Sequence, residues 1–158
     1  MLNLSYIGAI YFGIVSSLVY TGYFVINGSL TLIYPNDAYI AYILFYSTYA
    51  GSNLIVTYIS SKVNFSIFLF VSSFTFLFLV LSVSSGIVSL MFVGQAICGI
   101  GHSIGRLCVG IGISKLSHNN NGVIMGIFST IWNSSIFFGN LISLIVLLDR
   151  KSTRLNSS

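Results

Sequence analysis

Charged side chains are scarce in this sequence, with six Lys or Arg and two Asp or Glu among 158 residues, or 5%. An average soluble domain carries roughly 25% charged residues. So few charges cannot coat the wet surface of a soluble domain of this length, which excludes a water-soluble fold. Hydrophobic residues make up 56% of the chain and the mean hydropathy is +0.98. Both values indicate that lipid is the natural solvent.

Acidic residues are the rarest charged groups. Asp37 and Asp149 are the only two, and both fall outside the apolar segments, which excludes a paired-carboxylate catalytic site. The sequence also lacks the G-x-S-x-G motif, a phosphate-binding loop and the H-E-x-x-H motif. We therefore expect neither enzymatic activity nor a cofactor.

Basic residues and cysteines are also few. Three of the six basic residues lie in the last nine positions and the others are far apart, so no basic patch for nucleic acid exists. Cys98 and Cys108 share one apolar segment, where ten residues of helix separate them by about 15 Å, too far for a disulfide. They are typical of small buried hydrophobes. Cys98 and His102 offer too few ligands for a metal site.

Long apolar runs dominate what is present. A helix that crosses a bilayer needs roughly 20 mainly apolar residues. Five stretches qualify, at about Tyr6–Ile26, Tyr39–Ile59, Ile67–Val83, Ile87–Ile113 and Val123–Leu148. The first lacks the basic flank of a signal peptide, so we interpret it as a retained helix. The sequence predicts an all-α polytopic membrane bundle of about five transmembrane helices over residues 1–148, whose third and fourth helices form a tight hairpin at Ser84-Ser85-Gly86.

Loop charges indicate the topology. The predicted loops with charged residues are Asn27–Ala38, Ser60–Ser66 and Ser114–Gly122. Cytoplasmic loops are enriched in Lys and Arg, so Lys62 and Lys115 predict two cytoplasmic loops, with Asp37 outside and the amino terminus in the cytoplasm. The sequon at Asn27 then lies outside, but its closeness to the membrane argues against glycosylation.

The segment Asp149–Ser158 does not fit this topology. After five spans it should lie outside, yet it carries Arg150, Lys151 and Arg154. It resembles translated sequencing-adapter read-through, so we interpret it as a non-native tail. Polar termini that bury nothing stay disordered, and we expect residues 149–158 to lack regular structure.

The fourth predicted helix carries a stripe of small residues at spacings of 4, 3, 4, 3 and 4. Its members are Gly94, Cys98, Gly101, Gly105, Cys108 and Gly112. Such a stripe lets helix backbones approach closely in lipid, and Gly101 with Gly105 forms a G-x-x-x-G pair. Tight helix packing is the main interpretation, and flexibility in a moving transporter is the alternative.

Polar residues share a neighbouring face of this helix. Gln95, His102 and Arg106 lie within about 40° of one another. Ionisable groups in a membrane usually face a bundle interior or a water-filled cavity. Alternatively, the long Arg106 side chain reaches the cytoplasmic interface. His102 is either a proton-relay group or a histidine that hydrogen-bonds to a neighbouring carbonyl.

Two other helices carry polar stripes. The fifth carries Gly122, Gly126, Ser129, Asn133, Asn140 and Ser143 at helical spacing. Asn133 and Asn140, one heptad apart, either bond across helices or contact a substrate. Tyr49 and Asn53 in the second helix lie too far from its ends for an interfacial belt, so they need neighbouring helices or a ligand as partners. Together with Gln95, His102 and Arg106, these four residues are our candidates for a substrate cavity.

Several segments resemble a known family. They are Gly99-Ile100-Gly101, Gly110, Gly126-Ile127-Phe128, Asn133-Ser134-Ser135-Ile136-Phe137-Phe138-Gly139-Asn140, and in the second helix Tyr46 and Ser52-Asn53-Leu54-Ile55. They resemble the Unc-ninety-three-like branch of the major facilitator superfamily over about Asn3 to Leu148. This resemblance implies a protein of twelve helices in two halves, of which this chain supplies five.

The resemblance leaves two hypotheses of function. The favoured one is a membrane transporter-like protein of the major facilitator type, which binds a small molecule or an ion. The alternative is a non-transporting regulatory or trafficking subunit of another membrane protein, because members of the branch include such partners. Arg106 replaces an aromatic residue of the branch, and Ser60–Ser66 lacks the Asp-Arg signature of facilitators. Both departures argue against transport and proton coupling.

Overall fold

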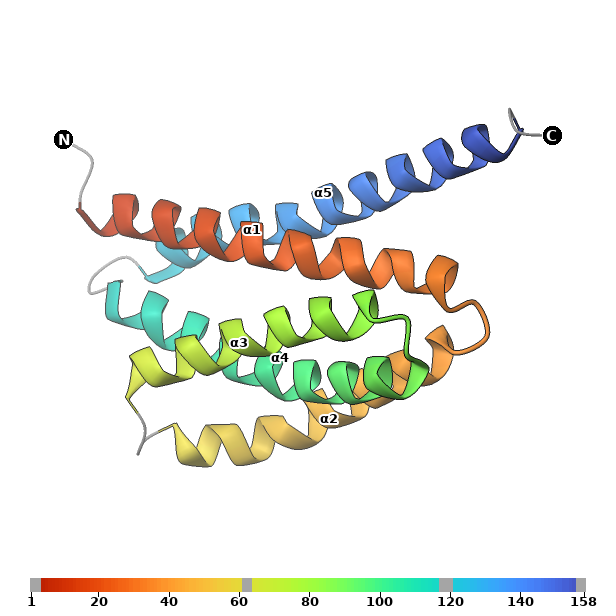
Figure 1. The fold of residues 1–158 in the computed structure, drawn as a ribbon. Coiled ribbons are helices and arrows are strands. Elements are labelled where there is room, and N and C mark those ends of the chain that lie inside the picture. The colour runs from red at the N-terminus through yellow and green to blue at the C-terminus, as the bar shows by residue number, and fades with distance from the viewer. Residues whose placement is uncertain (1–3, 61–63, 117–120, 156–158) are drawn as a thin grey trace. The chain divides into compact units, whose positions relative to one another are not determined.

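The computed structural model describes residues 4–60, 64–116 and 121–155. These residues form five α-helices and contain no strand. The helices are α1 (Leu4–Ile33), α2 (Ala38–Ile59), α3 (Phe65–Ser84), α4 (Val88–Leu116) and α5 (Asn121–Leu155), as Figure 1 shows. The predicted all-α bundle is confirmed. Lys62 and residues 117–120 of the predicted loops lie outside the described residues.

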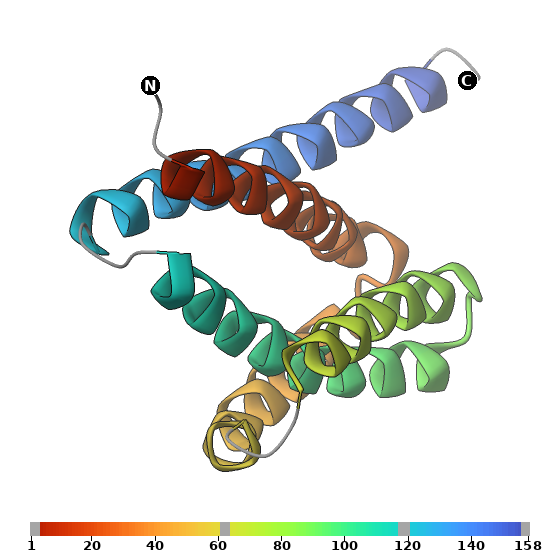
Figure 2. The same ribbon diagram turned by 90° about the vertical axis from the view of Figure 1, so that its left-hand side faces the viewer.

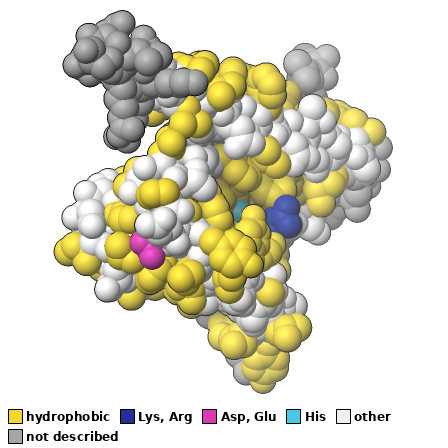
Figure 3. Space-filling model, turned by 90° about the vertical axis from the view of Figure 1, so that its right-hand side faces the viewer, with side chains coloured by type: hydrophobic (Ala, Val, Ile, Leu, Met, Phe, Trp, Pro, Cys, Tyr) yellow, Lys and Arg dark blue, Asp and Glu magenta, His cyan; other side chains and the backbone are white. Residues whose placement is uncertain are grey.

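Four of the five described helices are long and apolar enough to cross a bilayer, namely α1, α3, α4 and α5. Helix α2 has 22 residues but does not reach the hydropathy of a candidate span, because five tyrosines and Asn53 interrupt its aliphatic residues. Figure 3 shows hydrophobic side chains over much of one face and very few charged ones. The chain is a multi-pass membrane protein.

The first helix is longer than the sequence predicts. The loop was expected to begin at Asn27, whereas α1 continues to Ile33. Asn27 is buried, and a Cβ atom at Gly28 would lie 2.9 Å from the Ser143 Cβ atom. The Ser29 hydroxyl donates to the Val25 carbonyl at 2.8 Å. Packing and local hydrogen bonding thus override the turn preference of this segment, and the sequon lies inside a helix.

The last helix is also longer than predicted. We expected residues 149–158 to lack regular structure, but α5 continues to Leu155. Adding a residue to an existing helix is far easier than starting one, and Lys, Arg and Leu are good helix formers. The expected lack of regular structure is therefore wrong for residues 149–155. The foreign origin of the segment stays a prediction.

The predicted hairpin between the third and fourth helices is confirmed. Helix α3 ends at Ser84 and α4 begins at Val88. The Ser85 N–H donates to the Leu81 carbonyl at 3.1 Å, and Gly86 follows with φ of 74°. This left-handed conformation favours glycine after a helix end.

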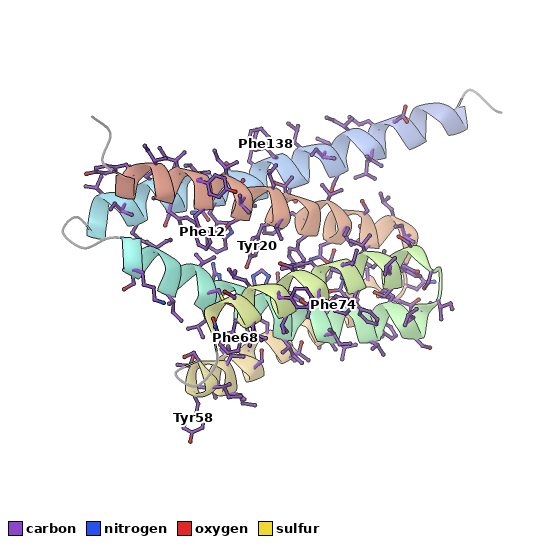
Figure 4. The ribbon with its side chains drawn as sticks, turned by 60° about the vertical axis from the view of Figure 1, so that its left-hand side comes forward. Phe12, Tyr20, Tyr58, Phe68, Phe74 and Phe138 are labelled. Atoms are coloured by element: carbon purple, nitrogen blue, oxygen red, sulfur yellow. The ribbon has the colours of Figure 1, made fainter. Side chains whose placement is uncertain are left out.

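The chain divides into two compact units. One contains Met1–Leu30 and Ile113–Ser158, and the other contains Thr31–Gly112. In the first unit α1 lies along α5 (Figure 1). The Tyr20 ring, labelled in Figure 4, meets Trp132 edge to face at 5.2 Å.

The second unit contains α2, α3 and most of α4 (Figure 2). Its helices meet around a small apolar cluster. The cluster consists of Val56, Phe68, Ile104 and Cys108, with Leu69 and Leu107 packed against it. Because these residues come from all three helices, the cluster holds α2 and α3 against α4 and so positions the polar residues described below.

Candidate functional site

The contact between α2 and α4 depends on Gly99. A Cβ atom at Gly99 would lie 2.5 Å from the Phe45 carbonyl oxygen and 3.0 Å from the Tyr49 backbone nitrogen. The two backbones therefore approach so closely that only glycine fits. This approach places Tyr49, and Asn53 one helical turn further, directly beside α4.

Two hydrogen bonds join these residues to α4. The Ser103 hydroxyl donates to Asn53 Oδ1 at 2.7 Å. Arg106 Nη1 donates to the Tyr49 hydroxyl oxygen at 3.3 Å. The polar residues that sequence periodicity assigned to separate helices thus meet in one place. We call Tyr49, Asn53, His102, Ser103 and Arg106 the polar seam.

His102 lies among aromatic rings in the middle of the polar seam. The ring centroids of Tyr49 and Phe45 lie 5.1 and 5.5 Å from that of the imidazole, both nearly perpendicular to it. Phe76 of α3 is a third neighbour at 6.3 Å. Such edge-to-face contacts fix the orientation of the imidazole. Helices α2 and α3 therefore both position this α4 side chain.

Gln95 does not belong to the polar seam. It lies seven residues before His102, about 10 Å along the helix axis. Its side chain is completely buried. Gln95, His102 and Arg106 were predicted to share one face of the helix. In the structure Gln95 is buried, His102 is half-buried and Arg106 is exposed.

Asn133 and Asn140 are both exposed on α5. The side of α5 that packs in its unit is buried instead, and consists of Ile124, Phe128, Ser135, Gly139 and Ser143. Ser135 lies about 160° around the helix from Asn133. The predicted stripe combined Ser143 with the two asparagines, and the structure separates them. Helical spacing groups residues within a broad sector of the helix surface. Packing in the structure buries one part of that sector, with Ser143, and leaves the part with the two asparagines exposed.

The small-residue stripe of α4 is buried at Gly94, Cys98, Gly101, Gly105 and Cys108 and half-buried at Gly112. A Cβ atom at Gly94 would lie 2.7 Å from the Ser82 Cβ, and one at Gly101 would lie 2.5 Å from the Thr75 Cβ. The Ser72 hydroxyl donates to the Gly101 carbonyl at 2.9 Å. The stripe therefore packs against small polar side chains of α3.

Sequence reasoning missed several of these partners. Ser72, Thr75 and Ser82 recur at helical spacing in an otherwise apolar helix, and that spacing was a detectable signal. Ser103 is a single serine beside His102, and Phe45 and Phe76 are ordinary membrane residues. For these three the sequence carried no distinctive signal.

The polar seam combines hydrogen-bond donors, such as the Tyr49 and Ser103 hydroxyls, with the positive charge of Arg106. A guanidinium and a phenol side by side suit an oxyanion. Within the described part of the chain, no three His, Cys, Asp or Glu residues cluster to hold a metal ion.

Comparison with known proteins gives one match. A family described as ion channel regulatory protein UNC-93 matches residues 29–158. No curated protein and no solved structure matches the chain. The matched segment includes α2, α3, α4 and α5, and with them the whole polar seam.

Proposed function

This chain belongs to the UNC-93 family, and on that premise we propose that it is a non-enzymatic regulatory subunit of another membrane protein, an ion channel. The matched family is described as ion channel regulatory. In this proposal the chain binds a channel within the bilayer and moves no solute itself. The amino terminus is cytoplasmic in the same proposal.

The observation that carries the proposal is the pair of exposed amides on α5. Asn133 and Asn140 lie seven residues apart and hence on one side of a helix long and apolar enough to span the bilayer. Lipid offers amide groups no hydrogen-bond partner. A channel helix with polar side chains would satisfy both amides, as amides do between membrane helices.

The surface around these amides permits a close approach. Gly126 lies one heptad before Asn133, and the position that its Cβ atom would take has no atom within 4 Å. Small residues at such positions let a second backbone come near. A partner helix can therefore reach the amides without displacing α1, which packs on the opposite side of α5.

The polar seam supports the same proposal. Two hydrogen bonds join its groups across α2 and α4, from Ser103 to Asn53 and from Arg106 to Tyr49. A solute path needs polar groups that exchange partners as the solute passes. Groups that pair across α2 and α4 instead stabilise one arrangement of the helices.

The first prediction concerns the two amides. Replacing Asn133→Leu and Asn140→Leu together should lower channel binding by about tenfold or more, because each interhelical hydrogen bond contributes roughly 0.6–2 kcal/mol. The measurement is the amount of a co-expressed channel that co-purifies with the chain, together with its current. Helix content should stay unchanged, because both side chains are exposed.

Phe138→Leu is the matched control. Phe138 is exposed on the same helix (Figure 4), about 140° around from Asn133. Channel binding by this variant should equal that of the unmodified chain. Equal binding by the double asparagine variant would show that this side of α5 does not contact the channel.

A second candidate function is transport of the major facilitator type. It is favoured by the resemblance to that superfamily and by the convergence of Tyr49, His102 and Arg106 in one membrane-embedded place. Proteoliposomes that contain the chain distinguish the two functions. Gradient-driven uptake of an anion that Arg106→Gln abolishes would favour transport, whereas uptake equal to that of empty liposomes favours the regulatory proposal.

A further inference from the structure

We propose that Arg106 and Tyr49 form a binding site for a phosphate group, supplied by the headgroup of an anionic phospholipid in the leaflet at the carboxyl end of α4. The inference goes beyond the proposed function and holds for either orientation of the chain in the bilayer. It rests on the hydrogen bond between the two side chains, on their depth in the membrane and on the open space beside them.

The depth of Arg106 suits a lipid headgroup. Helix α4 has 29 residues, or about 43 Å, whereas the hydrocarbon core is about 30 Å thick. If the middle of the helix lies at the middle of the bilayer, Arg106 lies about 6 Å beyond it and about 9 Å inside the hydrocarbon edge. An Arg side chain at this depth extends toward the headgroups, and the bilayer thins to meet it.

The direction of Arg106 is set by Tyr49. The Arg106 side chain is exposed, and its Nη1 donates to the Tyr49 hydroxyl oxygen at 3.3 Å. Because that oxygen accepts a hydrogen bond, the Tyr49 hydroxyl hydrogen points elsewhere and suits a phosphate oxygen. The guanidinium has five N–H donors in a planar fork that matches phosphate. The two side chains together present donors to one oxyanion.

Open space lies one helical turn beyond the pair, toward the carboxyl end of α4. Gly110 is one helical turn beyond Arg106 and is exposed. A Cβ atom there would have no neighbour within 4 Å. A headgroup can therefore lie against α4 at Gly110, one helical turn from the guanidinium.

The charge of this unit also favours an anion. Asp37 is the only acidic residue within Thr31–Gly112. It lies twelve residues before Tyr49, about 18 Å along α2. Within the described residues of this unit, Arg106 is thus the charged side chain that lies against the Tyr49 hydroxyl.

The test measures lipids retained by the full chain. The chain is purified from nanodiscs of 4:1 phosphatidylcholine and phosphatidylglycerol, and the bound lipid is identified by native mass spectrometry. We expect the ratio of phosphatidylglycerol to phosphatidylcholine among the bound lipids to exceed that of the bilayer by about tenfold. Arg106→Gln should remove the enrichment, and Tyr49→Phe should reduce it by about threefold. Lys115→Gln removes a charge from the last turn of the same helix, about 180° around it from Arg106. It should lower the ratio by no more than about fivefold, the effect of a nearby surface charge, and clearly less than Arg106→Gln does.

Two further arms complete the test. Arg106→Lys keeps the charge but loses the fork, so it should retain part of the enrichment and keeps the test valid should Arg106→Gln not fold. Inorganic phosphate added at 10 mM distinguishes the sources, because displacement of the lipid would identify a soluble phosphate as a ligand of the same site. Enrichment that persists in Arg106→Gln, or is absent from the unmodified chain, would overturn the proposal.

Discussion

Replacing Gly99 by alanine is expected to destabilise the chain by about 3 kcal/mol. The added methyl group would lie 2.5 Å from the Phe45 carbonyl oxygen and 3.0 Å from the Tyr49 nitrogen. Both are backbone atoms inside α2, so no side-chain rotation relieves the overlap. The helices must separate, and the hydrogen bonds from Ser103 to Asn53 and from Arg106 to Tyr49 are then lost together.

The measurement is the loss of helical signal in a titration with sodium dodecyl sulfate, from mixed micelles. Gly51→Ala is the matched control, because Gly51 lies within α2 and a Cβ atom there has no neighbour within 4 Å. Alanine at Gly51 should stabilise the chain by about 0.5–1 kcal/mol, since glycine is the poorer helix former. If both variants unfolded at the same detergent fraction, the close contact between α2 and α4 would be disproved.

Replacing Gly101 by valine should have a similarly large effect, about 3 kcal/mol, on the hairpin of α3 and α4. A Cβ atom at Gly101 would lie 2.5 Å from the Thr75 Cβ, which a rotation about χ1 does not move. Separation of the two helices would also break the bond from the Ser72 hydroxyl to the Gly101 carbonyl. The same detergent titration measures the effect.

Two companion variants make this prediction specific. Gly110→Val adds the same side chain to α4 where the neighbouring space is open, so its effect should be less than about 1 kcal/mol. Thr75→Gly with Gly101→Val should recover part of the lost stability, because it removes the Thr75 Cβ that the added side chain meets. Additive losses in that pair would show that Gly101 does not face Thr75.

The functional residues were only partly accessible from the sequence. Helical spacing selected Tyr49, His102 and Arg106 because polar groups are rare in an apolar helix. Spacing cannot show that Arg106 meets Tyr49, because the two residues are 57 positions apart. The same limit applies to Asn133, since periodicity groups residues by face but does not show which face is covered.

The sequence by itself determined the solvent and the class of fold. A chain with 5% charged residues must use lipid, and lipid requires every spanning backbone group to bond within a helix or a closed barrel. Gly86 likewise marked the hairpin, because its φ of 74° is a local backbone property. Tertiary structure alone decided where α1 ends, which residues form the polar seam and which side of α5 stays exposed. These outcomes depend on packing between helices far apart in the chain, and packing energies of this kind exceed the small local preferences that a sequence displays.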